Sequence, residues 1–212
     1  WEIFDNSRDE AMGGFADDIE VVLLPGGLVR VADNGRGIPV DIHKQTKVSA
    51  LDTIMTTLHA GGKFGGEGYK VSGGLHGVGA SVVNALSTYC MVEVHRDGEA
   101  HMQEYRIGKK KGNVKKVGAS KLHGTVVSFI PGTTIFTGGV EFDFDKVVAH
   151  LREQAYLVKG LRITVVDARK GEYKAPKPGA ELFIRQDLHD YPSQAFYFEG
   201  GLRSLIAFTN RS

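Results

Sequence analysis

The chain has 212 residues, of which 42% are hydrophobic and 24% are charged, a composition typical of a soluble globular domain with one substantial core. No apolar run reaches the roughly 20 residues that cross a bilayer and no secretion leader opens the sequence, so a membrane protein is excluded and a cytoplasmic one is expected. Lys and Arg number 26 against 25 Asp and Glu, a balance that argues neither for nor against nucleic acid. The single cysteine, Cys90, cannot form an internal disulfide, and we expect it to be packed.

Apolar spacing and glycine or proline breaks divide the chain into helices and strands. In chain order, we expect a helix over 1–14, strands over 19–24 and 28–32 joined as a hairpin, a helix over 49–58 behind a serine cap, a helix over 79–86, strands over 89–95, 101–107 and 125–130, a helix over 144–156, a strand over 161–167 and a helix from 202 onward. Gly13 and Gly14 are expected to end the first helix, because glycine accepts the left-handed conformation of helix ends. On that helix, Phe4, Ala11 and Met12 are expected to pack.

The order of these elements is mixed rather than strictly alternating. This favours an α+β fold, a two-layer sandwich of a mixed, mostly antiparallel sheet with helices on one face. Glycine dominates residues 60–79, where ordering the backbone would cost much entropy, so this segment is a candidate lid over a ligand. Residues 172–195 show little periodicity and are a possible insert. Helical patterns without caps stand at both ends, and we expect the chain to be a fragment of a longer protein.

Three polar side chains form a line on the first helix. Glu2, Asn6 and Glu10 recur every four residues and therefore share one face. A carboxylate can take a proton from water, and an amide oxygen is a hard ligand suited to Mg²⁺. Because a charged stripe on its own more often faces solvent, its interpretation depends on the motifs that follow.

The stretch 33–39, DNGRGIP, directly follows an expected strand. Asp33 at the strand end can accept a hydrogen bond from an exocyclic amine, while Gly35 and Gly37 let the backbone approach a flat ring closely. The same motif taken alone could equally be an ordinary turn.

A glycine-rich motif at 73–79, GGLHGVG, runs into an expected helix, where free backbone N–H groups and the helix dipole can hold phosphate. Its glycine order differs from G-x-G-x-x-G, and no G-x-x-x-x-G-K-[ST] occurs, so it belongs to neither of the two commonest phosphate loops. In the candidate lid, Lys63 and Lys70 could neutralise a terminal phosphate when the loop closes. The lysines at 109–111, 115 and 116 are expected to be solvated in a hairpin loop.

Together these motifs resemble the ATPase family shared by gyrase, the Hsp90 chaperone, histidine kinases and the MutL mismatch-repair protein. That family has an E-x-x-x-N helix, a D-x-G-x-G turn and a G-x-x-G-x-G lid, which match residues 2–6, 33–37 and 74–79 in the same order. Within the family, HAGGKF at 59–64 and YKVSGGLHGVG at 69–79 are similar to the bacterial type II topoisomerase branch. The resemblance covers residues 1–167 and again 197–201.

The resemblance implies ATP and Mg²⁺ as ligands and a role for each matched residue. Glu2 would polarise the attacking water, and Asn6 would hold Mg²⁺. Asp33 would bind the adenine amine, and Glu10 would pair with Arg36 beside the adenine. The remaining implied contacts are Gly37, Ile38, Pro39 and Thr125 in the adenine pocket, Arg96 at its mouth where inhibitors of the family bind, Lys63 and Lys70 at the terminal phosphate, and the backbone of Gly73, Gly74, Leu75, His76, Gly77, Val78 and Gly79 along the phosphate chain.

The resemblance also implies an ATPase domain of the Bergerat fold over 1–200 and the start of a transducer domain over 201–212. In the longer protein it implies DNA, a DNA-cleaving partner subunit and ATP-competitive inhibitors as partners, and a homodimer on ATP binding when the N-terminal arm is present. These 212 residues are expected to bind nucleotide and to hydrolyse it poorly on their own. Supercoiling of the gyrase type is favoured. The alternatives are topoisomerase IV-type decatenation, an Hsp90-like chaperone and a non-catalytic nucleotide sensor.

Overall fold

The computed structural model describes residues 1–42, 47–58, 79–173 and 176–209, with the backbone alone for 207–209. Within these residues, nine strands form one sheet. The strands are β1 (Asp18–Leu23), β2 (Val29–Asp33), β3 (Ser87–Arg96), β4 (Glu99–Arg106), β5 (Lys109–Lys110), β6 (Lys115–Ala119), β7 (Gly124–Pro131), β8 (Arg162–Asp167) and β9 (Ser193–Tyr197). The helices are α1 (Glu2–Met12), α2 (Ala50–Thr56), α3 (Gly79–Ala85), α4 (Phe144–Leu157) and α5 (Leu202–Thr209), with the 3-10 helices η1 (Pro25–Gly27) and η3 (Arg185–Leu188).

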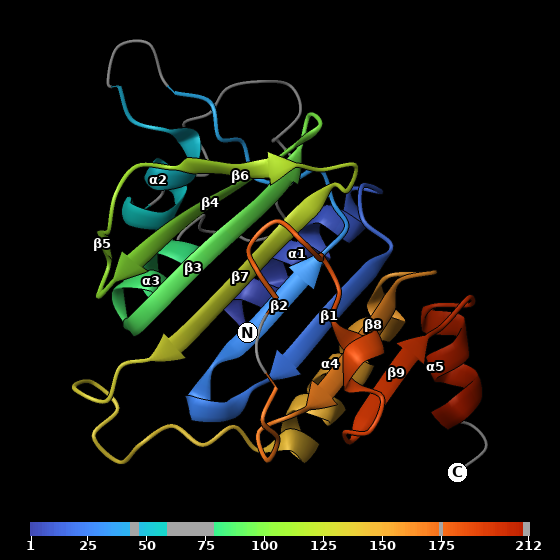
Figure 1. The fold of residues 1–212 in the computed structure, drawn as a ribbon. Coiled ribbons are helices and arrows are strands. Elements are labelled where there is room, and N and C mark those ends of the chain that lie inside the picture. Colours follow the sequence, from blue (N-terminus) through green and yellow to red (C-terminus); the bar gives the residue numbers. More distant parts are fainter. Residues whose placement is uncertain (43–46, 59–78, 174–175, 210–212) are drawn as a thin grey trace.

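The strands lie in the order β5–β4–β3–β7–β2–β1–β8–β9, and β6 pairs with β4 (Figure 1). Strands β1 and β8 run parallel, whereas the other strand pairs in the described part of the chain are antiparallel. Helices α1, α3 and α4 lie on one face of the sheet (Figure 1). The mixed, mostly antiparallel sheet with helices on one face is the α+β architecture predicted from the element order.

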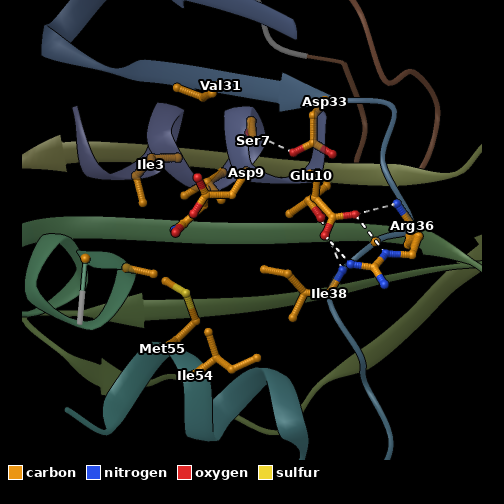
Figure 2. A pocket seen from close by; sticks show the side chains of 16 residues that line it. Ile3, Ser7, Asp9, Glu10, Val31, Asp33, Arg36, Ile38, Ile54 and Met55 are labelled. Atoms are coloured by element: carbon orange, nitrogen blue, oxygen red, sulfur yellow. Dashed lines mark hydrogen bonds and ion pairs between the residues drawn. The ribbon is translucent and has the colours of Figure 1, made fainter. Parts of the chain in front are cut away.

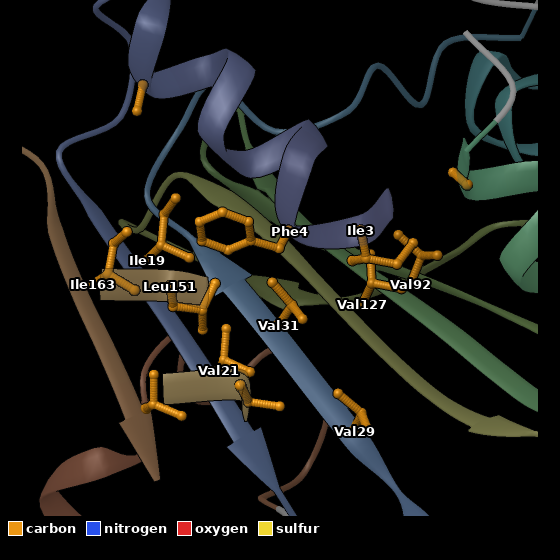
Figure 3. Packing of buried hydrophobic residues seen from close by; sticks show 14 of the residues in the cluster. Ile3, Phe4, Ile19, Val21, Val29, Val31, Val92, Val127, Leu151 and Ile163 are labelled. Carbon is orange, nitrogen blue, oxygen red and sulfur yellow. The ribbon is translucent and has the colours of Figure 1, made fainter. Parts of the chain in front are cut away.

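The main hydrophobic core lies between these helices and the sheet. Successive strand side chains point to opposite faces, so Ile19 and Val21 of β1 both face the helices. They pack with Phe4 of α1 and Leu151 of α4 in one buried cluster (Figure 3). Burial of each such side chain contributes roughly 1.5–3 kcal/mol. The apolar side of α1 is thereby held on the sheet, which positions the polar side of the same helix.

The helices and strands expected from the sequence are present in the described residues, with ends shifted by a few positions. Ser49 caps α2 as expected, since its hydroxyl accepts a hydrogen bond from the backbone N–H of Asp52 at 3.0 Å. The prediction that Met12 packs with Phe4 is wrong, because Met12 is 57% exposed. Eight residues of α-helix turn Met12 about 80° away from the direction of Phe4, which is enough to leave the core.

Part of the opposite face of the sheet is covered by the described residues of the segment that the sequence marks as a possible insert, 172–195. Its residues Ile184 and Leu188 are buried against Val22 of β1 and Val166 of β8. The end of the segment forms β9, a strand that periodicity did not predict. Residues 172–195 therefore supply a second, smaller core to the domain.

A buried ion pair attaches this segment to the sheet. Glu20 of β1 accepts hydrogen bonds from the backbone N–H groups of Ile184 and Arg185, both at 2.9 Å, and from the Arg30 guanidinium at 3.2 Å. Arg30 of β2 in turn donates to the carbonyl oxygen of Leu182 at 2.9 Å. Burial raises the pKa of Glu20 and lowers that of Arg30, and each partner offsets part of this effect on the other.

The five lysines at 109–111, 115 and 116 are exposed as expected, although their stretch contains short strands rather than only a hairpin loop. Lys109 and Lys110 form β5, and Lys115 and Lys116 begin β6. Lys110 pairs with Asp52 of α2 at 2.7 Å, and Lys116 pairs with Glu99.

Cys90 is fully buried in β3 as expected, and burial raises the pKa of its thiol to about 12. None of the described helices has the length and apolar character that a membrane crossing needs.

Candidate functional site

A pocket opens between α1, the turn after β2, and helices α2 and α3 (Figure 2). It is lined by Ile3, Asn6, Ser7, Asp9, Glu10, Val31, Asp33, Arg36, Gly37, Ile38, Ile54, Met55, Gly79, Ala80, Thr125 and Val127. Aliphatic side chains cover much of its wall, and a few polar groups converge at one end. A mostly apolar pocket with a few placed polar groups is typical of a small-molecule site.

Asp33, the last residue of β2, is the buried polar centre of this pocket. Its Oδ2 accepts a hydrogen bond from the Ser7 hydroxyl at 2.7 Å, and its Oδ1 accepts one from the Gly35 backbone N–H at 2.9 Å. Burial raises the pKa of Asp33 to about 6, the nearby Glu10 charge adds to the rise, and the two hydrogen bonds oppose it. Each carboxylate oxygen has two lone pairs, so the group can still accept a hydrogen bond from a ligand amine.

The turn after Asp33 packs closely against its neighbours. A Cβ at Gly35 would lie 2.8 Å from Oδ1 of Asp33, and one at Gly37 would lie 2.8 Å from the carbonyl oxygen of His95. Gly37 also has φ = 75°, which non-glycine residues rarely adopt. The Ile38 N–H donates to the Thr125 hydroxyl at 3.2 Å. Glycine is therefore required at both positions for the turn to form the pocket wall.

Arg36, in the middle of the turn, forms a bidentate ion pair with Glu10 of α1. Its Nε lies 3.1 Å from Oε2 of Glu10 and its Nη2 lies 2.7 Å from Oε1 (Figure 2). The guanidinium carbon also lies 3.6 Å from the centre of the Phe15 ring, a cation–π distance. The pairing of Glu10 with Arg36 that the motif resemblance implies is present in the structure.

Of the first two residues of the predicted polar line, Asn6 lines the pocket, whereas Glu2 lies outside its lining and beside Gly79. The Glu2 side chain stands against Gly79, so closely that a Cβ at Gly79 would collide with its carboxylate. Asn6 lines the pocket one turn farther along α1. Both residues remain exposed. In the described part of the chain, no group of three or more His, Cys, Asp or Glu side chains forms a metal cluster.

The structure brings eight of the predicted site residues together in one pocket. These are Asn6, Glu10, Asp33, Arg36, Gly37, Ile38, Gly79 and Thr125. Glu2, Pro39 and Arg96 do not line the pocket. Arg96 nevertheless donates from Nη1 to the carbonyl oxygen of Gly37 at 3.0 Å. The predicted Lys63, Lys70, Gly73, Gly74, Leu75, His76, Gly77 and Val78 lie outside the described residues, as does most of the candidate lid.

Ser7 is the contact that sequence reasoning missed. The sequence does contain a sign of this contact. Ser7 is a polar residue within the apolar stripe that Ile3, Phe4 and Ala11 form on the buried side of α1. A hydroxyl in such a stripe needs a buried partner, and here that partner is Asp33.

Two further pocket residues come from α2. Ile54 and Met55 belong to the helix predicted over 49–58, and they also form part of the pocket wall.

Comparison with known families assigns this pocket to a class. A family model described as histidine kinase-, DNA gyrase B-, and HSP90-like ATPase matches residues 1–135. The chain belongs to this ATPase family. The matched range contains the polar line of α1, the turn after Asp33 and the start of α3, which are the segments that form the pocket.

Curated proteins similar to the chain are gyrase B proteins. The DNA gyrase B protein of Halalkalibacterium halodurans is 48% identical over 212 residues, which is all of this chain and 30% of that protein. The Streptococcus pneumoniae serotype 4 protein is 47% identical over the same length, and the Enterococcus faecalis protein is 47% identical over 210 residues, which is 99% of this chain. The chain thus spans 30% of the length of these relatives.

A solved structure of the same family has a similar fold. It is a crystal structure of the 43K ATPase domain of Thermus thermophilus gyrase B in complex with an aminocoumarin, with a TM-score of 0.76 and 36% identity. The similarity covers 96% of this chain and 46% of that one. The sheet with helices on one face is therefore the fold of a gyrase B ATPase domain.

Proposed function

We propose that the chain is the ATP-binding and ATP-hydrolysing part of a bacterial type II DNA topoisomerase of the gyrase type, and that ATP drives closure of a dimeric clamp around DNA. The observation that carries the proposal is the buried Asp33, held by Ser7 and Gly35 in a pocket that continues to Asn6 and Gly79. The gyrase B relatives support the topoisomerase assignment.

In this proposal the adenine ring occupies the end of the pocket that contains Asp33, between apolar wall residues. Asp33 accepts a hydrogen bond from the exocyclic amine, and the ring lies against Ile38 and the Gly37 backbone. The Glu10–Arg36 pair borders the ring, and Thr125 holds the Ile38 N–H. Because burial places Asp33 in a low-dielectric site, its hydrogen bond discriminates more strongly between bases than the same bond in water. An aminocoumarin, present in the Thermus thermophilus complex, is expected to compete for this region.

The phosphate groups then extend toward Gly79 and Glu2. Glu2 takes a proton from the attacking water, which requires a carboxylate near the terminal phosphate and explains why it remains solvated. The backbone of residues 73–79 follows the phosphate chain, and Lys63 and Lys70 neutralise the terminal phosphate.

Mg²⁺ fits the donors at this end of the pocket. The exposed side chains of Glu2 and Asn6 offer carboxylate and amide oxygen atoms one helical turn apart on α1, and oxygen atoms are the ligands Mg²⁺ takes. Asn6 would hold the ion through its amide oxygen, together with phosphate oxygens. Bound there, Mg²⁺ would offset the negative charge of the phosphates.

Substitution of Glu2 tests the enzymatic role. Glu2→Ala is expected to reduce the ATPase kcat of the full-length protein by at least about 100-fold while the affinity for a non-hydrolysable ATP analogue stays within about threefold, because the general base acts on the water and not on the nucleotide. Asp5→Asn is the matched control, since Asp5 is on the same helix and pairs with Arg8 at 2.9 Å. Unchanged turnover in Glu2→Ala would refute the role of Glu2 as the general base, and absence of turnover in the unsubstituted full-length protein would leave a nucleotide sensor as the better assignment.

The longer protein would act with DNA, with a DNA-cleaving partner subunit, and as a homodimer in the cytoplasm. Residues 1–200 would form its ATPase domain and 201–212 the start of a transducer domain. A full-length protein reconstituted with its partner subunit is expected to introduce negative supercoils into relaxed circular DNA in an ATP-dependent reaction. Decatenation without supercoiling would assign it to the topoisomerase IV type instead.

A further inference from the structure

A buried hydrogen-bonded chain of three side chains lies on the side of the sheet away from the ATP pocket. His95 near the end of β3 is fully buried, and Glu93 and Ser120 beside it are almost so. The Nε2 atom of His95 lies 3.1 Å from Oε1 of Glu93, and its Nδ1 lies 2.8 Å from the Ser120 hydroxyl. No residue of the proposed ATPase chemistry belongs to this trio.

The His95 ring bridges two side chains from different segments. Its Nε2 shares a hydrogen bond with the Glu93 carboxylate of the same strand, and its Nδ1 shares one with the Ser120 hydroxyl of the loop after β6. The Ser120 oxygen also accepts from the Leu122 N–H at 3.1 Å, and the Ser120 N–H donates to the carbonyl oxygen of Gly98 at 2.9 Å. Ser120 thus ties the loop 120–123, between β6 and β7, to the end of β3.

The loop 120–123 and the end of β3, which Ser120 connects, both contact the turn at Gly35–Gly37 of the pocket. From the loop, Nδ1 of His123 donates to the carbonyl oxygen of Gly35 at 2.9 Å. From the end of β3, Arg96 donates to the carbonyl oxygen of Gly37 at 3.0 Å, and the His95 backbone packs against Gly37. The turn contains two glycines and has little conformational preference of its own, so its position depends on these external contacts.

We propose that the Ser120–His95–Glu93 chain is a positioning element for adenine recognition, which acts through His123 and Arg96 to fix the Gly35–Gly37 turn beside Asp33. The proposal rests on the proposed ATP-binding role of the pocket. Ser120 and His95 do not line the pocket, so their effect on nucleotide binding is indirect. Without the Ser120 hydroxyl the loop and the strand end lose their shared contact, and the turn samples more conformations at a cost to binding.

The test compares nucleotide affinity among variants of the loop. Ser120→Ala is expected to weaken binding of a non-hydrolysable ATP analogue about two- to tenfold, the range of one net hydrogen bond. Ser120→Thr keeps the hydroxyl and is expected to restore the affinity. Lys121→Ala, an exposed neighbour in the same loop, is the matched control. A purely structural role of Ser120 would lower the melting temperature and leave the affinity of the folded protein unchanged, which would overturn the proposal.

A double-variant cycle with His123 tests whether Ser120 acts through the loop. In a His123→Ala background, Ser120→Ala is expected to add little further loss, because the contact from the loop to Gly35 is already absent. Full additivity of the two losses would contradict the proposal. If the unsubstituted chain binds no ATP analogue, the proposed function fails, and amide exchange at Gly35 and Ile38 still decides on positioning. Faster exchange at those amides in Ser120→Ala supports it and unchanged exchange refutes it.

Discussion

Asp33 couples the protonation of the pocket to both folding and binding. Its pKa rises from 3.8 in the unfolded chain to about 6 because the folded protein buries it. Between these two pH values the folded state binds more protons than the unfolded state, so the free energy of unfolding falls as pH rises through this window. A shift of this size corresponds to about 3 kcal/mol. The protein thus retains at its binding site a carboxylate that is costly to ionise.

Nucleotide affinity is also expected to depend on the ionisation of Asp33. It should increase with pH over the range in which the free energy of unfolding decreases. Binding of the adenine amine needs an accepting carboxylate, so affinity for an ATP analogue should increase as pH rises through about 6. Asp33→Asn should bind weakly and lose this dependence. Calorimetric titration of both proteins over a pH series checks the expectation, and a parallel pH profile in the two would exclude Asp33 as the titrating group.

Ser7 sets the midpoint of that profile. Its hydrogen bond to Oδ2 favours the ionised carboxylate and lowers the pKa of Asp33 against the effect of burial. Ser7→Ala is therefore expected to move the midpoint of the affinity profile to higher pH, and Ser7→Thr to leave it close to the original value. A midpoint that moves to lower pH in Ser7→Ala would contradict the assigned role of the hydroxyl.

At the scale of elements, a buried ion pair anchors the segment that covers the far side of the sheet. Glu20 and Arg30 come from adjacent strands, and each also binds backbone groups of residues 181–185. Both partners are nearly inaccessible to solvent. Each is the strongest charged neighbour of the other, so removal of one leaves a buried charge without its main ionic partner.

Arg30→Met is expected to destabilise the protein by about 3–5 kcal/mol, because it leaves the Glu20 carboxylate buried without this cation. Glu20→Gln added to Arg30→Met removes the unpaired charge and keeps an oxygen for the Ile184 N–H, so the double variant should be more stable than the single one. Denaturant unfolding of the three proteins measures the difference. A double variant less stable than Arg30→Met would show that the carboxylate, rather than its missing partner, determines the stability.

At the scale of the whole molecule, the chain contains the pocket proposed to bind nucleotide but spans only 30% of the length of its gyrase B relatives. In the proposed function, nucleotide binding needs only residues of this chain. Clamp closure and coupling to DNA would also need surfaces that join two subunits, so hydrolysis would depend on more of the protein than binding does.

The isolated chain is accordingly expected to bind an ATP analogue with an affinity within about tenfold of that of the full-length protein, and to hydrolyse ATP at least about tenfold more slowly. Equilibrium binding and steady-state turnover of the two proteins, measured side by side, test both expectations. Full-length turnover rates in the isolated chain would refute the dependence on dimer closure. The Glu2→Ala variant provides the background rate for both proteins.

Much of this architecture could be predicted from local patterns. The apolar spacing of α4, the Ser49 cap and the glycine and proline turn at 25–27 each involve residues close in the chain, and all three appear in the structure. The short strands β5, β6 and β9 were missed because they lack apolar alternation and exist through pairing with β4 or β8. Met12 was misplaced because eight residues of α-helix turn its side chain about 80° away from that of Phe4, which leaves it 57% exposed.

The order of three short motifs was enough to indicate an ATP pocket, because each motif needs particular residue types at nearby positions whatever surrounds it. Which polar groups became buried was decided only by the tertiary structure. Ser7 meets Asp33, and Ser120 meets His95, across segments that the chain alone does not bring together. Burial is a property of packed surfaces rather than of neighbours in sequence, so the perturbed pKa of Asp33 and the supports of its turn emerge only when the helices and the sheet close on one another.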